Sequence, residues 1–456
     1  MLSFLKVDKD EALKKELLKD IIDEDKIQKL IKSGADINQT DHNGRTLLFE
    51  LARKKRLESI KILLQNGADL NKEDKYGKTV LNEAINKEDS LMVRFLLSNG
   101  ACVNRINESG RTLLQDVAIE GNHRIFKILL SFDPDLSIVD KYGRTVLFDA
   151  VMGGSLDLVR DALDRTPNAN AINQNGQSVI FEAVLSENSE IPKYLINQGL
   201  DVTISDNNRQ NPLFNAVVLG AKNIEVVELL IQNGARLNQK DKDDRTLLDE
   251  ILYIVSLTSD VFAKVEGKYK LVRKDRDYLA LTSRLIELGL AVDRTDKDGK
   301  TVLFKEVMRH NYETLEFLLG AGVDINAVDK NGKTVLFYAM LEGYENISMI
   351  DFLIKNGADL NKLDSEENSI IDDLIEIILV QRQDKKPENK LFLRIDESKD
   401  FISLLKRLLL LNPKINRQKQ NGQTALFKAI LFDDLELIEV LLNNGADANL
   451  KDSEGN

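Results

Sequence analysis

Apolar residues recur along this chain at helical spacing, in pairs of short segments separated by polar breaks. In the first pair, Leu48 and Ala52 lie on one face of a predicted helix. Ile60 and Leu63 lie on one face of a second predicted helix, which Gly67 is suited to end. The pattern therefore predicts two short amphipathic helices joined by a break.

This pair belongs to a phrase that returns along the chain: Asp-x-x-Gly-x-Thr-x-Leu-Phe-x-Ala, a helical stretch, then Asn-Gly-Ala-Asp-apolar-Asn. Asp-x-x-Gly is typical of a turn, because Asp bonds its own backbone and Gly accepts a positive φ. One such unit cannot bury its own apolar face, so neighbours must stack into a solenoid. The phrase glycine recurs at one constant interval, at Gly44, Gly77, Gly110, Gly143 and Gly176.

The phrase resembles the repeat signature of the ankyrin family, Thr-Pro-Leu-His-x-Ala, whose period of about 33 residues matches the glycine interval. The matching residues here are Thr46-Leu47-Leu48-Phe49, Thr145-Val146-Leu147-Phe148, Thr334-Val335-Leu336-Phe337 and Thr424-Ala425-Leu426-Phe427, and only Asn211-Pro212-Leu213-Phe214 keeps the proline. The resemblance implies an all-α dominated solenoid of repeats, each a β-hairpin finger followed by two antiparallel helices. It implies an N-terminal cap and eleven repeats.

Phenylalanine replaces the family's histidine in seven repeats, where we expect apolar packing in place of a polar contact. These residues are Phe49, Phe148, Phe181, Phe214, Phe304, Phe337 and Phe427.

The later repeats are irregular and indicate a duplication. In the later repeats the phrase-glycine position is occupied by Arg209, Asp244, Gly299, Gly332, Glu367, Gly422 and Gly455. From Arg209 onward, the spacing between these residues follows a series of three unequal intervals that occurs twice. The predicted organisation of one continuous domain is a capping half-repeat at 1–40, regular repeats over 41–208, a three-repeat block at 209–331, its duplicate at 332–454, and a truncated start of another repeat at 455–456.

Each block carries a long insert between the two helices of its longest repeat. The inserts span about 256–277 and about 381–399, and both contain an alternating run typical of β structure. Long loops in compact repeats often have functions, but a recent duplication would also preserve both copies.

Composition narrows the function classes. A formal net charge of −12 argues against nucleic-acid binding, which needs a basic face. A single cysteine, Cys102, suits a reducing cytoplasm, and no apolar run is long enough for a signal peptide or a membrane span. The Lys-, Asn- and Ile-rich style suggests a bacterial protein, with a secreted effector as the alternative to a cytoplasmic one. We expect a monomer.

Candidate chemistry is sparse. The histidines occupy unrelated repeat positions, and no Cys/His cluster has metal-ligand spacing. Gly77-Lys78-Thr79 ends like a phosphate loop, but the first glycine of that motif is missing, since Lys72 occupies its position. The sequence predicts no catalytic residues, no metal and no cofactor.

Two surface patterns remain, and the first is basic. Lys or Arg directly follows the phrase-glycine position in several repeats, and Tyr76 and Tyr142 occupy two predicted fingertips. Such an edge would attract an acidic partner, although ankyrin repeats commonly carry these residues in turns. The basic residues are Arg45, Lys78, Arg111, Arg144, Arg245, Lys300 and Lys333.

The second pattern is apolar and occurs seven residues after the helix-starting Thr position, which the family leaves free. If these side chains line a concave face, they form a protein-binding groove over repeats three to nine; if they turn inward, they pack between repeats. The residues are Ile119, Met152, Leu185, Val218, Tyr253, Met308 and Leu341.

The leading functional hypothesis is a non-catalytic scaffold that binds a partner protein on the surface formed by fingers and first helices. The alternative is a targeting or regulatory module of a larger enzyme or effector, whose catalytic domain lies beyond Asn456. A purely structural array is a third possibility.

Overall fold

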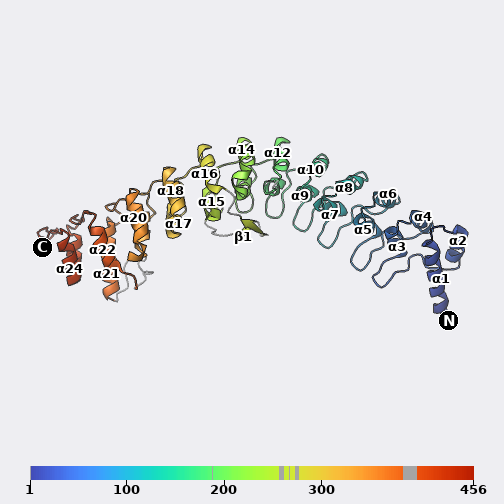
Figure 1. The fold of residues 1–456 in the computed structure, drawn as a ribbon, viewed down its shortest axis with the longest axis horizontal. Helices are drawn as coiled ribbons and strands as arrows, with labels where there is room; N and C mark the ends of the chain where they lie inside the picture. The colour runs from blue at the N-terminus through green and yellow to red at the C-terminus, as the bar shows by residue number, and fades with distance from the viewer. Residues whose placement is uncertain (1, 187, 256–260, 266–267, 273–276, 384–397) are drawn as a thin grey trace. The chain divides into compact units, whose positions relative to one another are not determined.

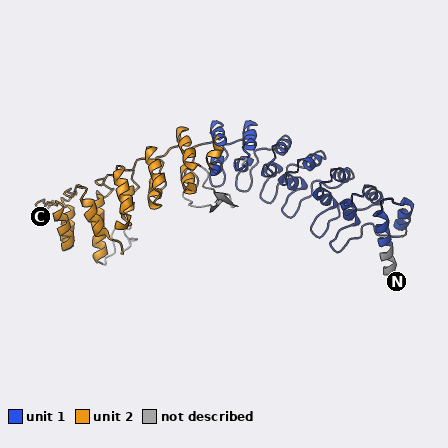
Figure 2. Ribbon diagram, viewed as in Figure 1, with its two compact units in different colours: residues 1–219, 225–235 blue, residues 220–224, 236–456 orange. Residues whose placement is uncertain are grey.

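A computed structural model describes the chain except residues 1, 187, 256–260, 266–267, 273–276 and 384–397 (Figure 1). Its contacts divide it into two compact units (Figure 2). Unit 1 comprises residues 1–219 and 225–235, and unit 2 comprises residues 220–224 and 236–456. The expectation of one continuous domain remains a prediction.

Unit 1 consists of helix pairs in two layers. Successive first helices such as α7 and α9 pack together, and so do second helices such as α6 and α8. The pairs are α1 (Leu2–Leu17) with α2 (Glu24–Lys32), α3 (Leu47–Arg53) with α4 (Leu57–Gln65), α5 (Val80–Asn86) with α6 (Ser90–Ser98), α7 (Leu113–Ile119) with α8 (His123–Leu130), α9 (Val146–Met152) with α10 (Leu156–Leu163), α11 (Val179–Ala183) with α12 (Glu190–Asn197), and α13 (Pro212–Ala216) with α14 (Ile224–Gln232), the last pair joined by the 3-10 segment η1 (Val217–Asn223).

Unit 2 repeats this arrangement, with α17 packed on α19 and α21 on α23. Its pairs are α15 (Leu247–Val255) with α16 (Tyr278–Glu287), α17 (Val302–Met308) with α18 (Tyr312–Gly320), α19 (Val335–Met340) with α20 (Ile347–Lys355) through η2 (Tyr344–Asn346), α21 (Ile370–Gln383) with α22 (Phe401–Leu409), and α23 (Ala425–Leu431) with α24 (Leu435–Asn443).

The core lies between the helix layers. The periodic apolar residues of the first repeat are buried, including Leu48, Ala52, Ile60 and Leu63. Six of the seven signature-position phenylalanines are also buried, as the expected apolar packing requires; Phe427 is half-buried.

The fingers are tight turns, and antiparallel bridges close several of them. Among the described residues, finger pairing is limited to isolated bridges such as Ile106 with Thr112 and Ile172 with Ser178. The turn geometry itself is as predicted. Even Asp244 and Glu367, at phrase-glycine positions, adopt positive φ values of 60° and 63°.

Where the phrase closes with asparagine, that residue links neighbouring repeats. In unit 1, Asn71 Oδ1 accepts the backbone N–H of Cys102 at 2.8 Å. In unit 2, Asn326 Oδ1 accepts the N–H of Asp359 at 2.8 Å, while its Nδ2 donates to the carbonyl of Gly357 at 2.9 Å. These bonds satisfy backbone groups that would otherwise lack partners between helix pairs.

The first insert contains an antiparallel pair of strands, β1 (Val261–Val265) and β2 (Lys268–Val272), in which Val261 pairs with Val272. The alternating run predicted this structure. In the second insert, α21 extends to Gln383 and α22 begins at Phe401, while residues 384–397 lie outside the described chain.

Candidate functional site

The predicted apolar stripe is only partly available at the surface. Tyr253 and Met308 in unit 2 are about half exposed, at 48% and 49%. Ile119 and Met152 in unit 1 and Leu341 in unit 2 are half-buried.

Leu185 and Val218 correct the prediction of a continuous stripe, because both side chains are buried in unit 1. The first helices before them, α11 and α13, have only five residues each and end before the stripe position. The side chain there packs inside the unit. Neither residue can anchor a partner, and the inward-packing alternative holds at these two positions.

The predicted basic edge is largely engaged in ion pairs within the protein. Arg144 Nη2 lies 2.8 Å from Asp140 Oδ2, and Arg111 Nε from the preceding repeat lies 3.5 Å from the same atom. In unit 2, Arg245 Nη2 lies 2.8 Å from Asp241 Oδ2. Because finger carboxylates neutralise much of their charge, these arginines attract an acidic partner less strongly than their number suggests.

Two finger carboxylates, Asp140 and Asp74, are held in their charged form. Burial alone would raise the pKa of Asp140, but hydrogen bonds from the side chain and backbone of Arg144 and the backbone of Tyr142 outweigh it, so the pKa is lowered. The same balance lowers the pKa of Asp74, which accepts Arg45 Nε at 3.1 Å across the repeat boundary. The Arg45–Asp74 and Arg111–Asp140 pairs therefore join adjacent fingers.

Lys333 is a second correction, because its side chain is buried and not at a fingertip. Its Nζ lies 2.5 Å from Asp364 Oδ2 and 2.6 Å from Asp373 Oδ2, so it links α21 to the preceding finger. Lys300 is half-buried, and its Nζ lies 4.1 Å from the centre of the Tyr338 ring. Lys333 thus has a structural role.

The two fingertip tyrosines are exposed, at 68% for Tyr76 and 50% for Tyr142. Lys141 Nζ and the Arg144 guanidinium lie 5.1 and 5.2 Å from the centre of the Tyr142 ring, close enough for cation–π contact. An exposed ring held by neighbouring cations has few conformations to lose on binding.

The structure adds three exposed apolar residues that the sequence reasoning missed. Ile106, Val139 and Ile172 each immediately precede a finger turn, and all three are exposed. The available signal was their spacing, which equals the interval between phrase glycines. With the tyrosines they form the finger row of unit 1: Tyr76, Ile106, Val139, Tyr142 and Ile172.

Adjacent fingers in this row are joined directly through their backbones. The N–H of Lys141 donates to the carbonyl of Ser109 at 3.0 Å, and the N–H of Gln174 donates to the carbonyl of Tyr142 at 2.9 Å. A β-carbon on Gly110 would lie only 3.1 Å from the Lys141 nitrogen, so glycine is needed for this approach. The finger row is consequently presented on a fixed backbone.

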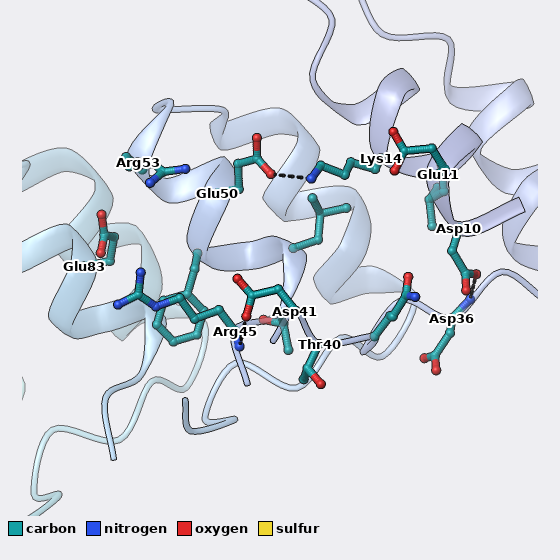
Figure 3. Close-up of a pocket in the computed structure, with 15 residues that line it drawn as sticks. Asp10, Glu11, Lys14, Asp36, Thr40, Asp41, Arg45, Glu50, Arg53 and Glu83 are labelled. Carbon is teal, nitrogen blue, oxygen red and sulfur yellow. Dashed lines mark hydrogen bonds and ion pairs between the residues drawn. The ribbon is translucent and has the colours of Figure 1, made fainter. Parts of the chain in front are cut away.

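A cavity of about 270 Å³ lies in unit 1 between α1 and the first finger (Figure 3). Carboxylates outnumber basic side chains in its lining, but several are engaged. Lys14 Nζ lies 2.9 Å from Glu50 Oε2, and Asp10 Oδ1 accepts the N–H of Asp36 at 2.7 Å.

The described part of the chain contains no group of three or more His, Cys, Asp or Glu side chains arranged to hold a metal ion. His123 lies 2.6 Å from Asp161 in a pair between α8 and α10. None of the helices that the structure describes combines the length and apolar character needed to cross a bilayer.

Two solved structures share local similarity with this chain. The human ASB11 ankyrin repeat domain is 24% identical over 45% of this chain and 91% of its own, with a TM-score of 0.39. The ankyrin repeat domain of Bcl-3, a member of the IkappaB family, is 22% identical over 46% and 95%, with a TM-score of 0.42. Curated protein sequences gave no significant match.

Family models match most of the chain. The model for ankyrin repeats in three copies matches residues 21–107, 150–241 and 272–364, and the single ankyrin-repeat model matches residues 421–450. Ankyrin repeat domains generally mediate protein–protein interactions, using surfaces that extend over several repeats. From these matches and the repeated finger and helix pairs, the chain belongs to the ankyrin repeat family.

Proposed function

We propose that this chain is a non-catalytic scaffold that binds a partner protein, and that the finger row of unit 1 is its principal contact surface. The supporting observation is that exposed aliphatic side chains recur at one finger position over three successive repeats, and that exposed tyrosines lie three residues further on at two fingertips. Aromatic anchors surrounded by polar residues are typical of protein-binding surfaces.

The chemistry of the row favours a partner with an apolar segment flanked by acidic residues. Lys75, Lys78 and Lys141 are exposed beside the tyrosines, whereas the neighbouring arginines are paired with finger carboxylates. The lysines would speed association with an acidic partner, and the apolar residues would slow its dissociation.

In unit 2, Tyr253 and Met308 are the exposed members of the stripe, and we propose them as additional contacts. Met and Tyr both suit such a role, since Met adapts its shape and Tyr combines an apolar ring with a polar tip.

The test starts from a partner identified by affinity capture and purified. In the triple variant Ile106→Thr, Val139→Thr and Ile172→Thr, each position takes the residue type that Thr40 supplies at the first finger, where the same isolated bridge forms. We expect at least roughly tenfold weaker binding by calorimetry, equivalent to about 1.4 kcal/mol, with an unchanged melting profile.

The matched control is Leu91→Thr, which alters an exposed apolar side chain on α6, away from the fingers. Binding that survives the triple variant, or that is lost in the control instead, would show that the finger row is not the contact surface.

A further inference from the structure

The exposed aliphatic residues of the finger row form a short run with a defined beginning and end. Ile106, Val139 and Ile172 occupy the same position in repeats three, four and five, and are 57%, 46% and 55% exposed. The same position holds Glu73 in repeat two and Ser205 in repeat six. Because stacked repeats share one orientation, the three aliphatic side chains lie in one line, which we call the aliphatic run.

Backbone hydrogen bonds fix the interval between neighbours in the aliphatic run. Within a finger, the N–H of Asp140 donates to the carbonyl of Arg144 at 3.0 Å, so two chain segments lie side by side. Between fingers, the N–H of Lys141 donates to the carbonyl of Ser109 at 3.0 Å. Chain segments bonded in this way lie about 4.8 Å apart, so two segments in each finger place equivalent residues about 10 Å apart. The packing of α7 on α9 agrees, because the axes of contacting helices lie about 8–10 Å apart.

A partner segment that follows the aliphatic run must present apolar residues at the same interval. In an α-helix, residues seven positions apart are separated by about 10.5 Å and lie on nearly the same face. In a β-strand, residues on one face are about 6.6 or 13 Å apart, which does not match. A polyproline II segment repeats at about 9.3 Å, but such segments dock in aromatic-lined grooves, and the aliphatic run contains no aromatic ring. Spacing and chemistry together favour an α-helix.

The charges beside the aliphatic run are unevenly distributed. Lys75 and Lys78 are exposed on the finger of repeat two, and Lys141 is exposed on that of repeat four. Glu108, in the turn of repeat three, is an exposed opposing charge. Gln174 and its neighbours in the turn of repeat five are uncharged. The exposed lysines therefore lie toward repeat two, where they would attract acidic residues of a bound helix.

We propose that the partner segment held by the finger row is an amphipathic α-helix of about 15 residues or more that lies along the aliphatic run. Its apolar residues at positions i, i+7 and i+14 contact the three residues of the run, and its acidic residues lie at the end nearest repeat two. This binding mode rests on the proposed function of the finger row and adds the partner's conformation to it.

The test is fluorescence anisotropy of labelled synthetic peptides titrated with the 456-residue chain. The heptad peptide carries leucines at i, i+7 and i+14 and glutamates at one end, in a helix-favouring background of alanine and glutamine. The shifted peptide has the same composition, but its central leucine is moved by two positions and leaves the shared face. We expect the heptad peptide to bind at least roughly tenfold more tightly, the effect of keeping one anchor.

Three comparisons connect this affinity to the aliphatic run. The triple variant Ile106→Thr, Val139→Thr and Ile172→Thr should bind the heptad peptide at least roughly tenfold more weakly than the wild type. Leu91→Thr, on the exposed surface of α6, should bind it as the wild type does. A heptad peptide with lysines in place of its glutamates should bind more weakly at low salt, where surface charges are least screened. Circular dichroism melting verifies the fold of each variant.

Equal affinities of the heptad and shifted peptides for the wild type overturn the proposed helix. So does tighter binding of a proline-rich peptide with leucine at every third position. Both measurements use the wild-type chain, so neither depends on the folding of a variant. Failure of the proposed function gives a different result, because the purified partner would then bind the triple variant as tightly as the wild type. A partner that is lost in the triple variant, while the peptides show no preference, overturns only the helix.

Discussion

At the scale of single residues, Asp149 on α9 is buried without full compensation. One carboxylate oxygen accepts Gln115 Nε2 at 3.0 Å, while Oδ1 has no hydrogen-bond partner within the described structure. Burial raises the pKa of Asp149 to about 7, although Arg144 and Arg111 act in the opposite direction. The carboxylate therefore costs stability once it ionises.

The sign of the resulting pH dependence follows from proton binding. Between about pH 4 and pH 7 the folded state retains a proton on Asp149 that the unfolded state has lost, so stability falls as the pH rises through this range. Asp149→Asn should remove this decline and stabilise the protein at pH 8 by at most about 4 kcal/mol. Denaturant unfolding at several pH values measures the effect.

The exposed Asp164→Asn, on the loop after α10, serves as the control. Parallel pH profiles for wild type and Asp149→Asn would contradict the assignment of the decline to this carboxylate.

At the scale of elements, a buried cation joins α21 to the finger and first helix of the preceding repeat. Burial alone would lower the pKa of Lys333, but the carboxylates of Asp373 and Asp364 outweigh it and raise the pKa, so the lysine is charged at neutral pH. Removing one partner of a buried ion pair leaves uncompensated charge behind.

Lys333→Met should therefore destabilise unit 2 by about 3–5 kcal/mol, the usual cost of breaking a buried pair from one side. Faster amide hydrogen exchange in α19 and α21 would locate the loss. Lys330→Met removes an exposed lysine from the same finger and should be nearly neutral. Equal effects of the two substitutions would mean that the buried ion pairs contribute little.

At the scale of the whole molecule, a net charge of −12 is combined with finger arginines that are mostly paired to finger carboxylates. Lysines are exposed on several fingers, but the paired arginines add little to a basic surface. Nucleic-acid affinity depends on such a surface to release counterions from phosphates.

We accordingly expect no measurable binding of duplex DNA or RNA by fluorescence anisotropy, even at about 50 mM salt, where phosphate contacts are strong. A basic DNA-binding domain under identical conditions provides the positive control. Binding that weakens steeply with added salt would show that the fingers form a phosphate-binding surface after all.

The sequence by itself determined the repeat period, the helix pairs, the turn positions and the β character of the first insert. These follow from local rules: apolar residues at helical spacing, turn residues at fixed positions and alternation in a strand. The turn positions were predicted correctly even where another residue replaces the glycine, since Arg209, Asp244 and Glu367 all adopt a positive φ.

Only the tertiary structure decided which side chains remain available to a partner. Met308 and Leu185 occupy the same repeat position, yet the first is half exposed and the second is buried beside a shortened helix. Lys300 and Lys333 are likewise equivalent in sequence, but only Lys333 has two carboxylates within 2.6 Å. Such outcomes depend on helix length and on side chains supplied by the neighbouring repeat, which the period of a single repeat does not contain.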